Sequence, residues 1–325
     1  MAIGAVCDLG SSSFQLLVCE YGPSGVLRPL LKRRALLNLG HDVGSKGNIP
    51  PGRVSAAVSA AKRLRRAVDA AKPDVVVALA TAALRDAANG RVVVDRLEKA
   101  LGVPVTVLDG PEEAQLCFAG QRASVYMSDE PTMGVDLGGG SFEIAVGNRF
   151  EVNFAATAPL GATRLRGEIA AGDPLTREDR KEVRERAREA VEATGIIASK
   201  YMRAARRTVL SGGTARALAR MVVARAKPYA GRAQWCVNQV ELSTSQVAET
   251  AEMLARMDLR QRLKLPGVSA SRAPVLPLGA CILQAVAEEL NVGHYVVSEW
   301  GLREGTLLEV LSDQGQLGFQ MGQKR

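Results

Sequence analysis

Two short segments, DLGSSSFQ at residues 8–15 and DLGGGSFE at residues 136–143, align with each other position by position. Each follows a short apolar run and precedes another, which predicts a strand, a tight turn and a second strand. Glycine and serine in such turns let the backbone approach a ligand and point several N–H groups at one anion. We therefore expect two similar domains to bind phosphate together, through Gly10, Ser11, Ser12, Ser13, Gly138, Gly139, Gly140 and Ser141.

The aspartate that ends each incoming strand places a carboxylate beside this anion site, where a divalent cation can bridge it to phosphate oxygens. A single Gly-rich turn is often no more than a hairpin turn, and the second copy favours the ligand site. The sequence has no GxxxxGK[ST] motif, and neither turn leads into a predicted helix. Both P-loop and Rossmann nucleotide sites are excluded on these grounds.

Two further segments allow either a phosphate contact or a structural role. Gly212, Gly213 and Thr214 follow an apolar run and open a predicted helix, where they can bind an anion or simply cap the helix. Arg85 follows the predicted strand 74–80 and can grip phosphate, but an ion pair with Asp86 is the simpler role. Arg303 and Glu304 are expected to form a salt bridge that holds the last helix.

The composition is that of an ordinary globular protein. The chain has 325 residues, 47% of them hydrophobic and 23% charged, and no apolar run long enough for a membrane span. Five scattered cysteines without a CxxC motif predict reduced thiols and a cytoplasmic protein with no membrane association. Two histidines are too few for a histidine-rich metal centre.

The net charge of +8 is unevenly distributed. Residues 200–240 contain no acid and nine cations, so we expect this stretch to lie partly along the site and attract a polyanion, with a solvated helix face as the alternative. A nucleic acid would suit the charge but does not explain the repeated hairpins, and aromatic residues make up only 4% of the chain.

Strands alternate with helices, which indicates α/β layers. We expect strands near 3–9, 14–20, 26–37, 74–80, 103–108, 207–211 and 294–298, and helices near 51–71, 89–101, 162–171, 176–194, 214–226, 244–257 and 274–290. Another helix is expected to begin near Pro111. The polar stretch 122–131 divides the chain into domains at 1–124 and 125–325, and the helix near 303–312 is placed to pack back on the first domain.

Eight segments, in this order, resemble the exopolyphosphatase and guanosine pentaphosphate phosphohydrolase family of the sugar kinase, heat-shock chaperone and actin superfold. They are DLGSSSFQLLV at 8–18, ATAALRDAANG at 80–90, DGPEEAQLCFAG at 109–120, VDLGGGSFEIAVG at 135–147, PLGATRL at 159–165, SGGTARAL at 211–218, RAPVLPLGACIL at 272–283 and SEWGLREG at 298–305. The resemblance implies two actin-like (ribonuclease H-like) domains related by an internal repeat, with the active site in the cleft between them.

The resemblance also implies roles for particular residues. Glu113 falls at the carboxylate that activates water, Asp136 and Glu143 at carboxylates that bind Mg²⁺ or, as a substitute, Mn²⁺, and Arg85 at an arginine that grips the substrate. The two hairpin turns and the SGGTAR loop fall at phosphate-binding loops. Phosphoanhydride hydrolysis needs little beyond charge neutralisation and an oriented water, which these groups can supply.

We therefore expect a Mg²⁺-dependent exopolyphosphatase that releases terminal phosphate from inorganic polyphosphate, with guanosine pentaphosphate as the alternative substrate. A nucleotide-binding, actin-like sensor without turnover is the alternative from another class, but it would not need Glu113. Ser12, Gln15 and Trp300 differ from the residues usual in the family, and Ser12 should weaken the phosphate contacts of the first turn. Because the chain ends after two domains, we expect shorter polyphosphate to be preferred and product to be released between cleavages. The sequence leaves open whether the protein forms a homodimer.

Overall fold

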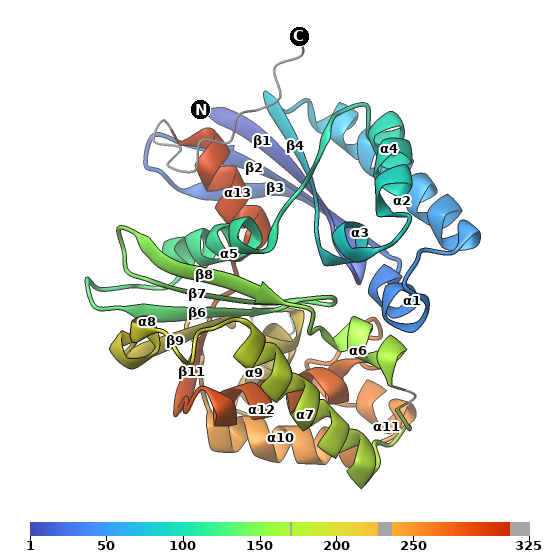
Figure 1. Ribbon diagram of the computed structural model, residues 1–325. Coiled ribbons are helices and arrows are strands. Elements are labelled where there is room, and N and C mark those ends of the chain that lie inside the picture. Colours follow the sequence, from blue (N-terminus) through green and yellow to red (C-terminus); the bar gives the residue numbers. More distant parts are fainter. Residues whose placement is uncertain (170, 227–235, 313–325) are drawn as a thin grey trace.

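The computed structural model describes residues 1–169, 171–226 and 236–312, which form two α/β units around two mixed sheets (Figure 1). The first sheet has the strand order β3-β2-β1-β4-β5. Its strands are β1 (Ala2–Leu9), β2 (Ser13–Tyr21), β3 (Leu27–Leu36), β4 (Val75–Ala80) and β5 (Val105–Val107). Around it lie α1 (Leu39–Lys46), α2 (Pro51–Ala71), α3 (Ala82–Asp86) and α4 (Gly90–Leu101).

The second sheet has the order β10-β11-β9-β6-β7-β8. Its strands are β6 (Thr132–Leu137), β7 (Phe142–Gly147), β8 (Val152–Ala158), β9 (Arg207–Gly212), β10 (Glu241–Ser243) and β11 (His294–Val297). The helices of this half are α6 (Ala162–Glu168), α7 (Arg177–Ala193), α8 (Lys200–Ala204), α9 (Gly213–Ala226), α10 (Thr244–Arg256), α11 (Leu259–Leu263) and α12 (Leu276–Glu289).

The two sheets repeat one topology. In the first, β1 pairs antiparallel with β2, β2 antiparallel with β3, and the parallel strands β4 and β5 follow on the other side of β1. In the second, β6, β7, β8, β9 and β11 take the same places with the same directions. The repeated sequence motifs are the turns of the β1–β2 and β6–β7 hairpins, as predicted.

Two helices cross between the sheets, namely α5 (Gly110–Ser124) and α13 (Leu302–Leu311) (Figure 1). From α5, Phe118 packs into an apolar cluster with Ala145 and Val209 of the second sheet. From α13, Leu307 is buried with Val6 of the first sheet. Each helix thus covers the sheet of the opposite half, and the division at 1–124 and 125–325 stays a prediction.

Glycines allow the two crossing helices to touch. A Cβ on Gly305 would lie 1.9 Å from the carbonyl oxygen of Leu116, and one on Gly120 would lie 2.2 Å from that of Gly301. Neither position admits a side chain at this separation. The close approach couples α5, which carries Glu113, to the loop that enters α13.

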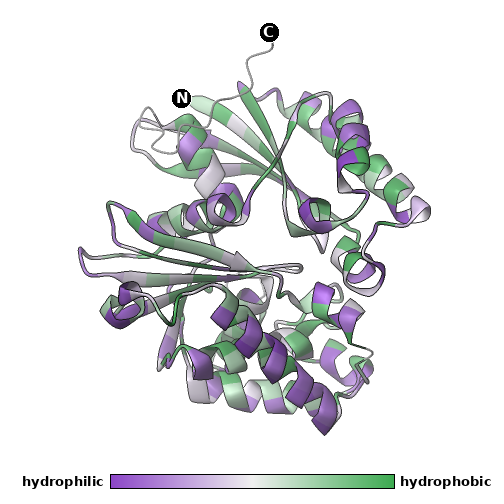
Figure 2. Ribbon diagram, viewed as in Figure 1, coloured by the Kyte–Doolittle hydropathy of each residue, from purple (hydrophilic) through white to green (hydrophobic). Residues whose placement is uncertain are grey.

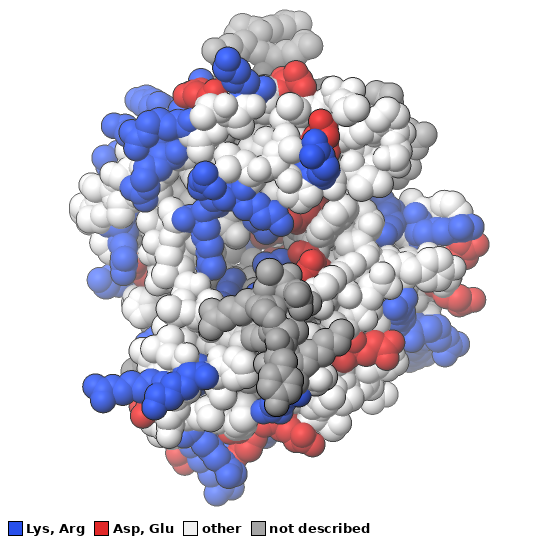
Figure 3. All heavy atoms as spheres, turned by 180° about the vertical axis from the view of Figure 1, so that it is seen from behind, with Lys and Arg blue, Asp and Glu red and all other residues white. Residues whose placement is uncertain are grey.

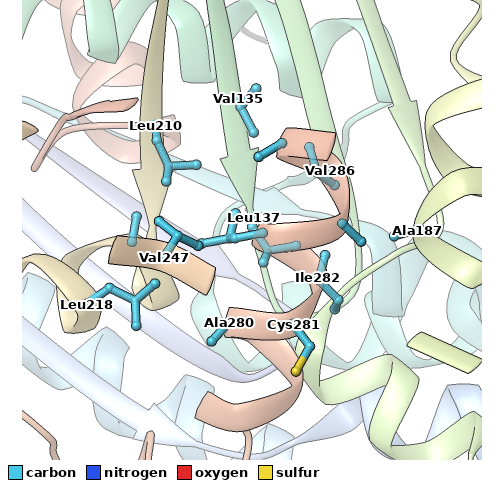
Figure 4. Close-up of a cluster of buried hydrophobic side chains, with 14 of the residues drawn as sticks. Val135, Leu137, Ala187, Leu210, Leu218, Val247, Ala280, Cys281, Ile282 and Val286 are labelled. Carbon is cyan, nitrogen blue, oxygen red and sulfur yellow. The ribbon is translucent and has the colours of Figure 1, made fainter. Parts of the chain in front are cut away.

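Apolar faces of the helices turn towards the sheets and polar faces turn outwards (Figure 2). In the larger core, Val135 and Leu137 of β6 and Leu210 of β9 pack against α12, including Ile282 and Val286 (Figure 4). This packing fixes the ends of β6 and β9, where the site is built. Among the described residues, no helix is both long and apolar enough to cross a membrane.

Sequence patterns missed the short elements α1, α3, β8, α8, β10 and α11. Helix α1 (Leu39–Lys46) contains two glycines, which lower helix propensity. Strand β8 (Val152–Ala158) is rich in alanine and is held in place by its pairing with β7. The predicted capping box of α7 is present, because Thr176 and Asp179 each accept from the other's backbone N–H.

Candidate active site

A cavity of about 110 Å³ lies where the ends of the two hairpins face each other. Most of the residues predicted from the sequence line it: Gly10, Ser11, Ser12, Ser13, Glu113, Asp136, Gly138, Gly139, Gly140, Ser141, Glu143, Gly212 and Gly213. They come from the turns of both sheets, from α5 and from the start of α9. The fold therefore brings residues far apart in the sequence to one small, polar space.

The two hairpin turns are in direct contact. A Cβ on Gly139 would lie 2.1 Å from Ser12 Oγ, and one on Gly140 would lie 2.1 Å from Ser11 Oγ, so only glycine fits at either position. The Ser12 hydroxyl is 2.6 Å from Thr163 Oγ1 of α6, which links the two halves by a hydrogen bond. Ser12 thus contacts the second domain in addition to lining the cavity.

Three carboxylates stand at the strand ends beside the turns. Asp136 and Glu143 are opposite each other across the β6–β7 hairpin, as Asp8 and Gln15 are across the β1–β2 hairpin. Asp136 accepts a hydrogen bond from Ser211, and Glu143 accepts one from Thr157 at 3.1 Å. These contacts hold the acidic groups at the cavity wall.

Burial makes ionisation of these acids costly. It raises the pKa of Asp8 to about 6 and raises the pKa values of Asp136 and Glu143, with Glu113 and Asp136 adding to the effect on Glu143. A divalent cation would relieve the repulsion, and carboxylate oxygens are the ligands that Mg²⁺ prefers. The donor set therefore fits Mg²⁺.

Glu113 and Glu112 are adjacent in sequence but face different surroundings. The exposed Glu112 accepts the backbone N–H of Asp109 at 3.0 Å and completes the capping box of α5. Glu113 is 5% exposed, lines the cavity and accepts a hydrogen bond from Arg85 at 2.8 Å. Burial raises the pKa of Glu113 to about 7, although Arg85 opposes that rise. A buried carboxylate with a pKa near neutrality is suited to act as a general base.

Two predicted substrate-binding residues are not part of the cavity lining. Arg85 donates to Glu113 and, at 3.0 Å, to the carbonyl oxygen of Leu108, so it positions the carboxylate in this conformation. Thr214 is buried at the start of α9, and its hydroxyl has no hydrogen-bond partner in the described part of the chain. Their contact with substrate stays a prediction.

Several other cavity residues were not assigned to the site from the sequence, although all of them lie in the eight segments that resemble the family. They are Gln15, Thr81, Cys117, Arg216, Arg272, Leu302, Arg303 and Glu304. Arg303 was expected only to hold the last helix, but it lines the cavity and lies 3.9 Å from Glu304. Two clues in the sequence pointed to Arg303: it lies next to glycines just after a predicted strand, and it belongs to the SEWGLREG segment at 298–305.

A second hollow, of about 370 Å³, adjoins the cavity and shares Gln15, Gly213, Arg216, Arg272, Arg303 and Glu304 with it. We call it the basic groove, because its lining carries seven cations and two acids: Lys32, Arg33, Arg34, Arg216, Arg220, Arg272 and Arg303 against Glu299 and Glu304. Viewed from behind, Lys and Arg side chains gather around a central hollow (Figure 3).

Several arginines of the groove repel one another. Burial lowers the pKa of Arg272, and the guanidinium groups of Arg34 and Arg216 lower it further. Burial and Arg303 likewise lower the pKa values of Arg34 and Arg216. A bound anion would reduce this repulsion, so the groove is suited to bind negatively charged groups.

The acid-free stretch is only partly where it was expected. Arg216 and Arg220 reach the basic groove, whereas Arg203, Arg206 and Arg207 line a separate hollow at the opposite end of β9. Strand β9 points its C-terminal Gly212 at the cavity, which places its N-terminal Arg207 at the far edge of the sheet. Only part of the stretch therefore lies along the site, these three arginines lie away from it, and Lys227 and Arg232 lie outside the described residues.

Known proteins are similar to this chain in both sequence and fold. The model of the Ppx/GppA phosphatase family matches residues 18–314. Exopolyphosphatase 1 of Mycobacterium tuberculosis is 29% identical over 309 residues, covering 95% of this chain and 88% of that protein. The crystal structure of an exopolyphosphatase from Cytophaga hutchinsonii has a TM-score of 0.85 at 25% identity and covers 95% of this chain and 97% of its own.

The Ppx/GppA family member from Aquifex aeolicus has a TM-score of 0.76 at 26% identity, with 95% of this chain and 97% of that chain covered. With the repeated sheet topology, these likenesses confirm the predicted α/β class and the actin-like fold. The chain therefore belongs to the Ppx/GppA phosphatase family and is a phosphoanhydride hydrolase.

Proposed function

We propose that this protein is a Mg²⁺-dependent exopolyphosphatase that hydrolyses the terminal phosphoanhydride bond of inorganic polyphosphate and releases orthophosphate. The observation that carries the proposal is the basic groove, which continues from the carboxylate-lined cavity. A site for one terminal phosphate that opens into a cationic groove suits a linear polyanion. The exopolyphosphatase names of relatives that match nearly the whole chain also support it.

In this proposal the terminal phosphate occupies the cavity. Backbone N–H groups of the turns around Ser11 and Gly139 surround its oxygens, and Arg272 and Arg216 hold the phosphates that follow. Asp136 and Glu143, with Asp8 nearby, hold Mg²⁺, or Mn²⁺ in its place, which neutralises negative charge on the substrate.

Glu113 accepts a proton from the attacking water, whose oxygen forms a bond to the terminal phosphorus. The bridging P–O bond then breaks, and the shortened polyphosphate leaves with the bonding electron pair. Arg85 keeps the Glu113 carboxylate in place through their 2.8 Å hydrogen bond.

Guanosine pentaphosphate is the second candidate substrate. Trp300 is among the residues that line the basic groove, and its indole gives a nucleobase an aromatic surface to stack on. The hydrolysed bond would be of the same kind, and only the leaving group would differ.

Phosphate release from polyphosphates of several lengths, guanosine pentaphosphate and ATP tests the proposal. We expect the highest kcat/KM on polyphosphate and no release in EDTA. A higher kcat/KM on guanosine pentaphosphate would show that this compound, and not polyphosphate, is the preferred substrate. Phosphate release that persists in EDTA would refute the metal-dependent reaction. A groove of about 370 Å³ has room for only a few phosphate units, so a partial digest of long chains should run as a ladder of intermediates on a gel.

A further inference from the structure

One cavity residue is not used by the proposed reaction, and that residue is a thiol. Cys117 lies on α5 one helical turn after Glu113, on the same helix face, and is 4% exposed. Its Sγ and one carboxylate oxygen each of Asp136 and Glu143 all lie within 4.8 Å of one another. The three side chains come from α5, β6 and β7 and line the same cavity.

We propose that Cys117, Asp136 and Glu143 form a site for thiophilic divalent ions such as Zn²⁺ and Cd²⁺, which compete there with Mg²⁺. The competition between Mg²⁺ and the thiophilic ion rests on the proposed function, in which Asp136 and Glu143 bind Mg²⁺. Binding of the thiophilic ion itself does not depend on it.

The spacing of the three atoms suits such an ion. Zinc binds sulfur at about 2.3 Å and carboxylate oxygen at about 2.0–2.2 Å, so ligand atoms in a tetrahedral site lie roughly 3.5 Å apart. Starting from separations within 4.8 Å, the ligand atoms need to approach one another by at most about 1.3 Å. A water or a phosphate oxygen can supply the fourth ligand, because the group opens into the cavity.

The ligand types favour a thiophilic ion over Mg²⁺. Mg²⁺ uses oxygen ligands and gains nothing from a sulfur atom, whereas thiolate strongly favours zinc and its heavier analogues. Cys117 is in no disulfide that would have to break, but burial and the nearby carboxylates raise the pKa of its thiol, so the ion has to displace the S–H proton. On binding, the S–H proton leaves to solvent and an S–metal bond forms.

The remaining cysteines do not offer a similar site. Cys7, Cys19 and Cys281 belong to apolar clusters, and Cys236 is exposed. None of them lines the cavity. Cys281, on α12, is therefore a matched control for the loss of a buried thiol.

The test is a titration of the metal-free protein with Cd²⁺. Binding is monitored through the ultraviolet charge-transfer absorption of cadmium bound to thiolate. All proteins carry Cys236→Ser, which removes the exposed thiol. In this background the parent protein and Cys281→Ala should show a band that saturates at one ion per chain, and Cys117→Ala should not. Cys117→Ser keeps the volume of the side chain and should also lack the band, while circular dichroism reports whether either variant is folded.

Equilibrium dialysis with Zn²⁺ in excess Mg²⁺ measures the selectivity. Loss of a partner outside the ligand shell costs about 10-fold to 100-fold in metal affinity, so removal of the Cys117 ligand should cost at least about 100-fold. A parent protein without the band, a folded Cys117→Ser protein that keeps it, or unchanged zinc affinity would overturn the inference. The absorption needs no turnover, so inactivity on polyphosphate would refute the proposed function and leave this result intact.

Discussion

Charge removal from the basic groove should weaken the salt dependence of polyphosphate binding by a calculable amount. Lys32, Arg33 and Arg220 line the groove but not the cavity, so changing all three to Ser leaves the reacting groups in place. Each phosphate neutralised on a flexible single chain contributes about 0.7 to the slope of log affinity against log salt. Loss of three contacts should therefore reduce the steepness of the slope by about 2. Between 50 and 200 mM salt, the affinity of the variant should then fall about 16-fold less than that of the parent protein.

The slope can be measured without hydrolysis by binding long polyphosphate to proteins that also carry Glu113→Gln. The matched control changes Arg203, Arg206 and Arg207 to Ser, which removes the same charge from the far hollow. The control should keep the parent slope. An unchanged slope in the groove variant, or an equal change in the control, would show that the groove does not hold the polymer.

Three more predictions concern the acidic groups. Glu113 must be ionised to accept a proton and has a pKa of about 7, so kcat/KM should fall about tenfold per pH unit below pH 7. Arg85→Met removes the cation that favours the carboxylate and should therefore move this fall in kcat/KM to higher pH. Asp136→Asn and Glu143→Gln should each raise the Mg²⁺ concentration for half-maximal phosphate release, and an unchanged requirement would remove that residue from the metal site. Burial raises the folded-state pKa of Asp8 from 3.8 to about 6 and that of Glu113 from 4.5 to about 7, so the stability that these groups contribute is lost as pH rises from about 4 to about 7. Mg²⁺ binds the ionised carboxylates and should therefore raise Tm more at pH 8 than at pH 5, and equal increments would contradict this.

Local sequence patterns were sufficient wherever one segment determined the structure. The strand-turn-strand repeats predicted both hairpins, and the acid pair at 112–113 after Pro111 predicted the start of α5. The local sequence provided no physical reason to assign the role of general base to Glu113 and not to Glu112. Their different roles follow from helix phase, which directs one to the cap and the other to the cavity.

Local patterns did not identify the residues that reach the site through long-range packing, although these residues lie in segments that resemble the family. Arg272 precedes α12 and meets Gly213, where a Cβ would lie 1.8 Å from its guanidinium nitrogen, a contact that no local pattern records. Cys117 looked like one more buried thiol because its neighbours in the sequence are apolar. The charge of residues 200–240 was read as one surface, but β9 carries Arg207 and Gly212 to opposite edges of the sheet.

Phosphate release from polyphosphate by Glu113→Gln, compared with Glu112→Gln, tests the central claim most directly. Glu113→Gln keeps the size of the side chain but cannot accept the proton of water, so the rate should fall by about 10²–10⁴ while polyphosphate still binds. Glu112→Gln changes an exposed capping residue and should retain most of the activity. A Glu113→Gln protein that hydrolyses polyphosphate at the wild-type rate would contradict the assignment of this cavity as the active site.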